Sequence, residues 1–395
     1  MIRLPKTDVL ILSASYGDGH QQAARALAAA LQEAKPQLEV EILDFFRFVN
    51  PLFNAVTRCS YIQTVRLAPR LYGTFYRLTG NIAPDSVFQR RLNRLGVAKL
   101  AHFLDDRRPG LIVCTYPTPA GVLSELRRTG RVRVPVVTVI TDNAVHSQWI
   151  HSHVDRYLVP CDAVRRGLLD RGVPPGRVAV TGIPINPKFA RRRDALALRE
   201  QWGLAPDVPV VLVMSGAYGM LGGTQDIARL LADFPAPLQA VVVCGHDRRL
   251  RQRLEPLARQ ASRPLHVFGF LNTIDELMAQ ADLLITKAGG LTTAEALAVG
   301  LPMLIYRPIP GQEEENTAFL TRAGAAVAAA DLDALASRLR ELLTQPERLA
   351  ELRAAALAVR QPHAAETAAR LLLELRREPV PTGQGAAAGG TVPAR

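Results

Sequence analysis

The chain has 395 residues, 48% of them hydrophobic, which is long enough for two domains with a core each. Its four cysteines lack metal-ligand or disulfide spacing and no stretch of about 18 apolar residues occurs, which excludes a zinc finger, a disulfide scaffold and a membrane-spanning chain. The net charge of +12 lies almost wholly in residues 1–190 and, without a nucleic-acid-binding signature, favours a membrane surface over nucleic acid as partner.

The first predicted elements are a strand over residues 8–13, a glycine-containing loop over 14–19 and a helix over 21–34. Strand, glycine loop and helix in this order open a Rossmann-like domain. His20 stands where the helix begins. A neutral imidazole there would act as a general base, with its pKa lowered by the positive helix end. The alternative is a histidine at the helix start that is hydrogen-bonded only by solvent and has no catalytic role.

A segment rich in aromatic and basic side chains follows a second strand and spans residues 45–95. Its composition predicts a membrane-surface element, with apolar side chains among the headgroups and arginines on lipid phosphates. The alternative is an ordinary helical insert with core aromatics and solvated arginines. The arginines assigned to the membrane are Arg58, Arg66, Arg70, Arg77, Arg90, Arg91 and Arg94.

Strands resume over residues 111–114 and 134–140, and the second runs into a loop that contains Asp142 and Trp149. Loops that leave the carboxyl ends of parallel strands line the cleft of open α/β sheets. Asp142 would orient an acceptor hydroxyl or the imidazole of His20, and Trp149 would stack on a sugar ring. Equally, Asp142 would only cap a turn and Trp149 would only fill the core.

No metal site is predicted. His146, His151 and His153 are close in sequence, but no carboxylate stands at a helical ligand spacing from them. Asp331 and Asp333 form a D-x-D pattern, yet Asp331 is better explained as a helix N-cap.

The first domain is predicted to end with strands over residues 157–159 and 178–181, and the proline-rich stretch 182–187 is the expected linker. A second sheet starts with a strand over 208–214, whose small following residues would let the backbone approach a pyrophosphate. A strand over 238–244 comes next. These stretches contribute Ser215, Gly216, Ala217 and Gly245 to a predicted nucleotide-diphosphate site.

Residues 283–306 carry the most informative motif, a short apolar strand, a double glycine, a helix over 292–299 and a further strand. The glycine turn exposes backbone N–H groups and a helix N-terminus, which together make an anion site, most often for phosphate. Glu295 would accept hydrogen bonds from a ribose diol. The alternative is a βαβ unit without a ligand. The positions assigned to this nucleotide-diphosphate site are Thr286, Lys287, Gly289, Gly290, Leu291, Thr292 and Glu295.

The loop after this motif supplies Gln312, Glu313 and Asn316, amide and carboxylate groups of the kind that hold a hexose. A solvated helix start, favoured by the helix dipole, remains the alternative for the neighbouring acids. Helices over residues 331–343 and 346–358 follow.

Several of these motifs, in this order, resemble the family of monogalactosyldiacylglycerol synthases and processive diacylglycerol glucosyltransferases. The resemblance extends to about residue 375. It implies an inverting UDP-sugar glycosyltransferase of the GT-B fold, an α/β protein with two Rossmann-like parallel-sheet domains that face a cleft. The segments that carry it are 13–20, 141–149, 181–184, 214–217, 286–295 and 310–316.

The resemblance also implies a division of the chain. Residues 1–187 would form an acceptor and membrane-association domain, and residues 188–361 a donor domain. A helix over 362–378 would cross back to the first domain, and the Gly-, Ala- and Pro-rich residues 379–395 are expected to be disordered.

Within this family His20 would deprotonate the acceptor hydroxyl, with Tyr16 on the acceptor side and Gly19 on the donor side, and Phe270 would lie against uracil. The implied substrates are UDP-glucose or UDP-galactose and diacylglycerol, with no metal or other cofactor. The implied location is peripheral, at the cytoplasmic face of the cell membrane, in contact with anionic lipids. Nucleic acid is not an expected partner.

Two departures from the family pattern are Asp18, where a third glycine is usual, and Ala288, where a proline is expected. Neither decides between glucose and galactose. The alternatives are a UDP-N-acetylglucosamine transferase acting on a polyprenyl-linked peptidoglycan precursor, a UDP-sugar 2-epimerase, and a non-catalytic UDP-sugar sensor that would not depend on His20.

Overall fold

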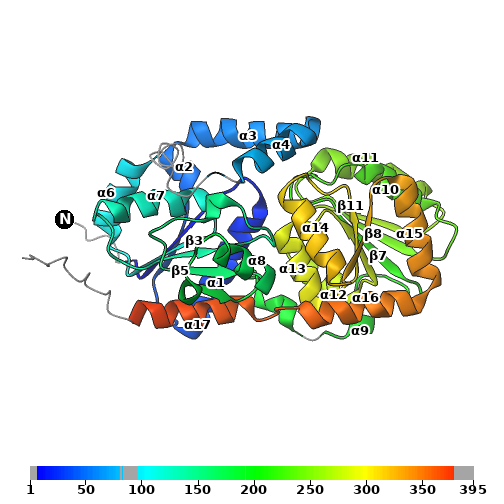
Figure 1. The fold of residues 1–395 in the computed structure, drawn as a ribbon. Helices are drawn as coiled ribbons and strands as arrows, with labels where there is room; N and C mark the ends of the chain where they lie inside the picture. Colours follow the sequence, from blue (N-terminus) through cyan, green and yellow to red (C-terminus); the bar gives the residue numbers. More distant parts are fainter. Residues whose placement is uncertain (1–6, 81, 83–95, 192, 378–395) are drawn as a thin grey trace, which may run out of the picture.

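Two six-stranded parallel β-sheets form the centres of two domains (Figure 1). The computed structural model describes residues 7–80, 82, 96–191 and 193–377. The strands of the first sheet are β1 (Val9–Ser13), β2 (Val40–Asp44), β3 (Leu111–Cys114), β4 (Val136–Val139), β5 (Arg156–Val159) and β6 (Val178–Val180). Those of the second are β7 (Val210–Met214), β8 (Gln239–Val243), β9 (Leu265–Phe268), β10 (Leu283–Thr286), β11 (Met303–Tyr306) and β12 (Ala326–Ala329). The predicted α/β architecture with two Rossmann-like domains is confirmed.

The strand order creates a switch point in each sheet. The order is β2-β1-β3-β4-β5-β6 in the first sheet and, from the far edge, β9-β8-β7-β10-β11-β12 in the second. The winding direction reverses between β1 and β3 and between β7 and β10. The loops at the carboxyl ends of these strands therefore diverge and leave a crevice, where open α/β sheets bind their ligands. The segments that hold His20 and Gly289 follow β1 and β10.

Helices cover both faces of each sheet. The central strands are buried on both sides and consist of continuous apolar runs, such as Val-Leu-Ile-Leu in β1. In the first domain the helices are α1 (Asp18–Ala34), α2 (Phe45–Val49), α3 (Pro51–Leu67), α4 (Pro69–Thr79), α6 (Val97–Arg107), α7 (Pro117–Arg128) and α8 (Asp162–Leu169). They are followed by α9 (Ala195–Gln201), α10 (Thr224–Ala232), α11 (Arg248–Gln260), α12 (Ile274–Gln280), α13 (Gly290–Val299), α14 (Gln312–Arg322), α15 (Leu332–Thr344), α16 (Pro346–Val359) and α17 (Ala364–Arg377).

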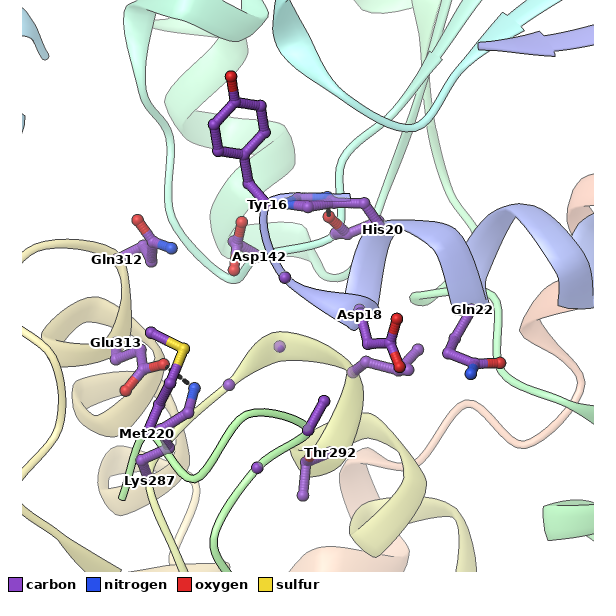
Figure 2. A pocket seen from close by; sticks show the side chains of 18 of the residues that line it. Tyr16, Asp18, His20, Gln22, Asp142, Met220, Lys287, Thr292, Gln312 and Glu313 are labelled. Carbon is purple, nitrogen blue, oxygen red and sulfur yellow. Dashed lines mark hydrogen bonds and ion pairs between the residues drawn. The ribbon is translucent and has the colours of Figure 1, made fainter. Parts of the chain in front are cut away.

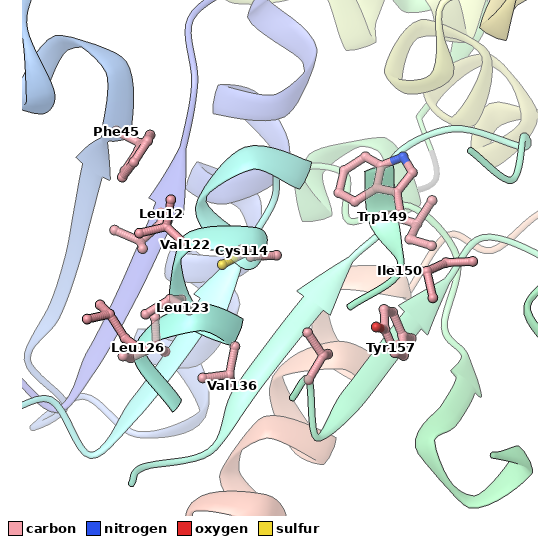
Figure 3. Close-up of a cluster of buried hydrophobic side chains, with 14 of the residues drawn as sticks. Leu12, Phe45, Cys114, Val122, Leu123, Leu126, Val136, Trp149, Ile150 and Tyr157 are labelled. Atoms are coloured by element: carbon pink, nitrogen blue, oxygen red, sulfur yellow. The ribbon is translucent and has the colours of Figure 1, made fainter. Parts of the chain in front are cut away.

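One core layer of the first domain is shown in Figure 3. Leu12 of β1, Cys114 of β3 and Val136 of β4 are fully buried there against the apolar face of α7. Trp149 belongs to the same layer and is only 4% exposed. The layer fixes the positions of the strand ends from which the site residues project.

The last helix, α17, lies on the first domain although it follows the second in sequence (Figure 1). Its small apolar face, which includes Ala368 and Leu372, packs in one cluster with Leu27 and Leu31 of α1. Arg376 near its end forms an ion pair with Asp8. The end of the described chain is therefore attached beside its beginning, and the predicted tail over 379–395 lies outside the described residues.

Two local differences from the sequence-based expectation have simple causes. Helix α1 starts at Asp18 rather than at residue 21, because Gly17 in an extended conformation is its N-cap, so His20 lies inside the first turn. Strand β12 was not predicted, because its alanines favour helices. The basic, aromatic segment after residue 45 forms α2, α3 and α4 as far as it is described.

Candidate active site

A cavity of about 790 Å³ lies between the carboxyl ends of the two sheets. Figure 2 shows His20 and Asp142 on its first-domain side, with Lys287, Gln312 and Glu313 on the second-domain side. Its lining includes Tyr16, Gly19, His20, Asp142, Trp149, Gly216, Ala217, Gly245, Phe270, Thr286, Lys287, Gly289, Gly290, Leu291, Thr292, Glu295, Gln312 and Glu313. All of these were predicted as site residues from the sequence.

His20 is held by the ends of two neighbouring strands. Its Nδ1 atom lies 3.0 Å from the carbonyl oxygen of Thr115, after β3, and 2.8 Å from the hydroxyl of Thr141, after β4. A carbonyl oxygen only accepts hydrogen bonds, so Nδ1 carries the proton. The lone pair then lies on Nε2, which is the tautomer that a general base requires. The hydroxyl of Thr115 in turn donates to the carbonyl oxygen of His20 at 3.2 Å.

The pKa of His20 is lowered, chiefly by burial, while the charge of Asp142 and the bond to Thr115 act in the opposite direction. The imidazole is therefore neutral near pH 7 and able to accept a proton. The predicted direction is confirmed, but the dominant cause is burial. Asp142 acts on His20 through its charge, whereas Thr115 and Thr141 make the hydrogen bonds that orient the ring.

A wall of aromatic rings runs from His20 to helix α4. Tyr116 meets the His20 ring edge-on at 4.9 Å, and Tyr16 stacks on Tyr116 at 5.9 Å. Tyr61 then links Tyr16 to Tyr72, with ring centroids 6.0 and 5.6 Å apart. Such rings offer apolar surface and hydroxyl groups together, which suits an amphipathic acceptor.

Two helix N-termini meet where the domains approach. A side chain at Gly19 in α1 would touch Leu291 in α13 at 3.6 Å, and one at Gly290 would come within 2.0 Å of the carbonyl oxygen of Thr141. Only glycine fits at position 290. Both helices point the positive ends of their dipoles at this region, which favours an anionic ligand.

Lys287 adds a full positive charge to the same region. Its ammonium group pairs with Glu313, and the alkyl chain lies against Gly216, which has a left-handed backbone (φ +78°). The second oxygen of Glu313 accepts the backbone N–H of Ile309 at 2.9 Å. Both oxygens of Glu313 are thus engaged, so it holds Lys287 and the loop in place rather than presenting a free carboxylate to a hexose.

Glu295 and Phe270 line the cavity on the second-domain side. Burial raises the pKa of Glu295 to about 8, and the nearby charge of Lys188 partly offsets this rise. Phe270 is 43% exposed and stacks flat on His246, with ring centroids 4.5 Å apart. An exposed flat ring in the cavity provides a platform on which a nucleobase would stack.

Two predicted donor residues lie outside the cavity. Ser215 is fully buried and donates its hydroxyl to the carbonyl oxygen of Val243. Asn316 is also fully buried, and it accepts the backbone N–H of Asn143 at 2.7 Å and donates to the carbonyl oxygen of Ala288 at 2.8 Å. Asn316 therefore joins the two domains instead of contacting a hexose.

The predicted lipid-binding arginines are distributed differently from the expectation. Arg58 lies over the ring of Tyr218 at 4.7 Å, and Arg77 pairs with Glu314, so both face the second domain. Arg70 is exposed. The side chain of Arg66 and the residues Arg90, Arg91 and Arg94 lie outside the described part of the chain.

Sequence reasoning missed the groups that orient His20 and most of the aromatic wall. Thr115 and Thr141 each follow an apolar strand, so the general rule for strand ends would have included them. Tyr61 and Tyr72 had been assigned to the membrane segment as a whole, without a place in the site. Lys188, which also lines the cavity, lies within the short helix η3 (Pro187–Ala190) and pairs with Asp275 at 2.8 Å.

Across the ranges that the structure describes, no three His, Cys, Asp or Glu side chains are grouped as metal ligands would be. Within the same ranges, no helix combines the length and apolar character needed to cross a bilayer.

Comparison with protein families gives two matches that divide the chain as the sheets do. Residues 20–185 match the family described as monogalactosyldiacylglycerol (MGDG) synthase. Residues 211–369 match the glycosyltransferase family 28 C-terminal domain. The first match contains His20 and, apart from Tyr16, the aromatic wall, and the second contains the glycine motif of α13.

Individual proteins agree with the family matches. The chain is 34% identical over 365 residues to a processive diacylglycerol beta-glucosyltransferase of Bacillus mycoides, covering 92% of each chain. Among solved structures, it is similar to MurG of Acinetobacter baumannii, with a TM-score of 0.61, 16% identity and coverage of 94% and 100%. It is also similar to Anabaena HepE in complex with UDP-glucose, with a TM-score of 0.56, 15% identity and coverage of 93% and 99%. The two structural similarities establish the fold only.

Proposed function

The chain belongs to the family of the processive diacylglycerol beta-glucosyltransferases, and we propose that it transfers a hexose from a UDP-sugar to diacylglycerol. The observation that carries the proposal is His20, whose Nδ1 proton is fixed by Thr115 and whose ring lines the cavity opposite the glycine motif of α13. The base would thereby face a site suited to an anionic donor.

In the proposed reaction, Nε2 of His20 takes the proton of the acceptor hydroxyl as its oxygen attacks the anomeric carbon. The bond between that carbon and the UDP oxygen breaks, and UDP leaves with the electron pair. A single displacement converts an α-linked donor into a β-glycoside. Lys287 and the N-termini of α1 and α13 would stabilise the departing diphosphate. This scheme uses no metal ion, so EDTA is expected to leave the rate unchanged.

Glucose is the proposed donor sugar, because the related proteins are named glucosyltransferases. Their names also describe a processive reaction, and we extend that property to this chain. A glycosyl group already on the acceptor would lie against the tyrosines between His20 and α4, since aromatic rings bind the apolar faces of sugars.

We further propose that α3 and α4 rest on the cytoplasmic face of the membrane. Six large apolar side chains on these helices are at least 60% exposed, which is unusual on the surface of a soluble protein. Exposed Arg70 would contact anionic lipid phosphates beside them. The six are Leu52, Val56, Leu67, Leu71, Phe75 and Leu78.

A liposome assay tests the proposal. Vesicles with diacylglycerol, with or without anionic lipid, would be incubated with the protein and either UDP-glucose or UDP-galactose, and the lipid products identified by mass spectrometry. A β-glucosyl lipid is expected. UDP binding without any sugar transfer would instead support a UDP-sugar sensor, and transfer only to a polyprenyl-linked acceptor would support the peptidoglycan alternative.

A further inference from the structure

Helix α4 of the first domain touches the loop that precedes α14 in the second. The contacts are close. A Cβ atom on Gly73 would lie 2.4 Å from Pro310, and one on Gly311 would lie 2.7 Å from the ring of Tyr76. Glycine at each position therefore lets the helix and the loop approach directly, and α4 is packed against the segment that presents Gln312 to the cavity.

One side-chain hydrogen bond crosses this contact. The hydroxyl of Tyr72 donates to the Oε1 atom of Gln312 at 2.9 Å. Burial raises the pKa of Tyr72 well above its usual value, so the phenol keeps its proton and remains a donor. The carbonyl side of the Gln312 amide is thereby occupied, and its NH₂ group is what remains for a ligand in the cavity.

The orientation of this amide matters because a primary amide has two different ends. An NH₂ group binds the lone pair of a sugar hydroxyl oxygen, whereas the C=O end accepts the hydroxyl proton. Without an external partner, the two orientations of a glutamine amide are close in energy. In the structure Tyr72 donates to the Oε1 end, which favours one of the two orientations, and the sugar is then read by a held group rather than by a freely rotating one.

Resting on the function proposed above, we propose that Tyr72 is a positioning residue that sets the sugar selectivity of the donor site through Gln312. Glucose and galactose differ in the orientation of a single hydroxyl, so a fixed amide distinguishes them and a freely rotating one does not. Tyr72 belongs to the acceptor domain, so this selectivity depends on the contact between α4 and the loop before α14.

The test measures binding and does not depend on turnover. The affinities of the full-length protein for UDP, UDP-glucose and UDP-galactose would be determined by calorimetry for wild type, Tyr72→Phe, Gln312→Ala and the double variant. Tyr72→Phe is expected to reduce the ratio between the two sugar nucleotides about five- to tenfold and to leave UDP affinity unchanged. In the Gln312→Ala background the same substitution is expected to have no further effect.

Thr74→Ala is the matched control, because Thr74 is on the same helix, is exposed, and bonds only within it to the carbonyl oxygen of Arg70 at 3.0 Å. It is expected to keep the wild-type ratio. Equal wild-type affinities for the two sugars, an unchanged ratio in Tyr72→Phe, or an equal effect of Tyr72→Phe with and without Gln312 would each overturn the inference. Failure of glycolipid synthesis in the liposome assay would instead overturn the proposed function.

Discussion

The form of His20 that the proposed mechanism requires, with the proton on Nδ1, comes from backbone geometry as much as from its own chemistry. The carbonyl oxygen of Thr115 determines which nitrogen holds the proton, and burial keeps the ring neutral. Because a main-chain oxygen supplies the key bond, no substitution at position 115 removes it directly. The state of the ring is therefore tested through His20 itself.

For His20→Ala we expect turnover to fall by about 10²–10⁴, the usual contribution of a general base, with little change in UDP affinity because most of the proposed donor contacts come from the other domain. At saturating UDP-sugar the wild-type rate should be constant from pH 7.5 to 6.5 and fall only below that, since the pKa of His20 is lowered from 6.5 and the neutral base persists down to the lowered value. The variant should lack this acid limb. A near wild-type rate in His20→Ala would exclude it as the base.

Glu295 gives a second pH-dependent prediction, from a pKa that is raised rather than lowered. Its pKa of about 8 means that the unliganded carboxyl is mostly protonated at pH 7. Ribose hydroxyls would favour the ionised form, so UDP affinity should rise from pH 7 toward 8 and then level off. Glu295→Gln should abolish this rise, and Glu295→Ala should weaken UDP binding by roughly 1.5–3 kcal/mol at pH 8. A pH-independent wild-type affinity would mean that Glu295 does not contact the ribose.

At the scale of single elements, α4 has two different faces. Tyr72, Tyr76 and Arg77 face the second domain, whereas the apolar face formed by Leu71, Phe75 and Leu78 is exposed. The two sets lie on opposite sides of a 3.6-residue helix. One face therefore contributes to the site while the other is available to a lipid surface.

We expect the double substitution Leu71→Ser and Leu78→Ser to weaken vesicle binding at least tenfold, since each removes a large apolar side chain from the proposed membrane face. Leu196→Ser is the matched control, because Leu196 is comparably exposed, at 64%, but lies on α9 of the second domain. Co-sedimentation with vesicles would measure both. Equal losses in the two proteins would argue against α4 as the membrane face.

Comparison of single strands with contacts between distant elements shows what the sequence could predict and what it could not. Apolar runs bounded by polar or turn residues gave the bounds of β3 and β11 correctly, because each strand is buried on both faces. The contact between Tyr72 and Gln312 joins residues 240 positions apart, and that between His20 and Thr141 joins residues 121 apart. Such pairs follow from the packing of domains, which no local pattern encodes, so the site's residue types were predictable and its hydrogen bonds were not.

At the scale of the whole molecule, the site exists only where the two domains meet. Gly290 approaches Thr141, and Asn316 bonds to Asn143, so the donor motif is attached directly to the loop that bears Asp142. The separation of base and donor therefore depends on this interface.

Gly290→Ala should separate the domains here, because its Cβ atom would lie 2.0 Å from the carbonyl oxygen of Thr141. We expect turnover to fall about 100-fold, as misplacement by about 1 Å can cause, with little change in melting temperature. Gly222→Ala is the matched control, since nothing lies within 4 Å of the added atom. Normal turnover in Gly290→Ala would show that catalysis tolerates a wider cleft.

The return of α17 to the first domain means that the chain passes between the domains twice. One passage follows β6 and the other joins α16 to α17, and they touch where Gly182 (φ +85°) leaves room for Gln361 and Ala364. Because the two connections lie side by side, the domains rotate most easily about the line through them. Twisting or sliding of one domain relative to the other is restrained. Figure 1 shows these passages on the side of the molecule away from α4. The contact at α4 is therefore the farthest from this axis. A small rotation moves Tyr72 away from Gln312 before it disturbs the contacts near the two connections.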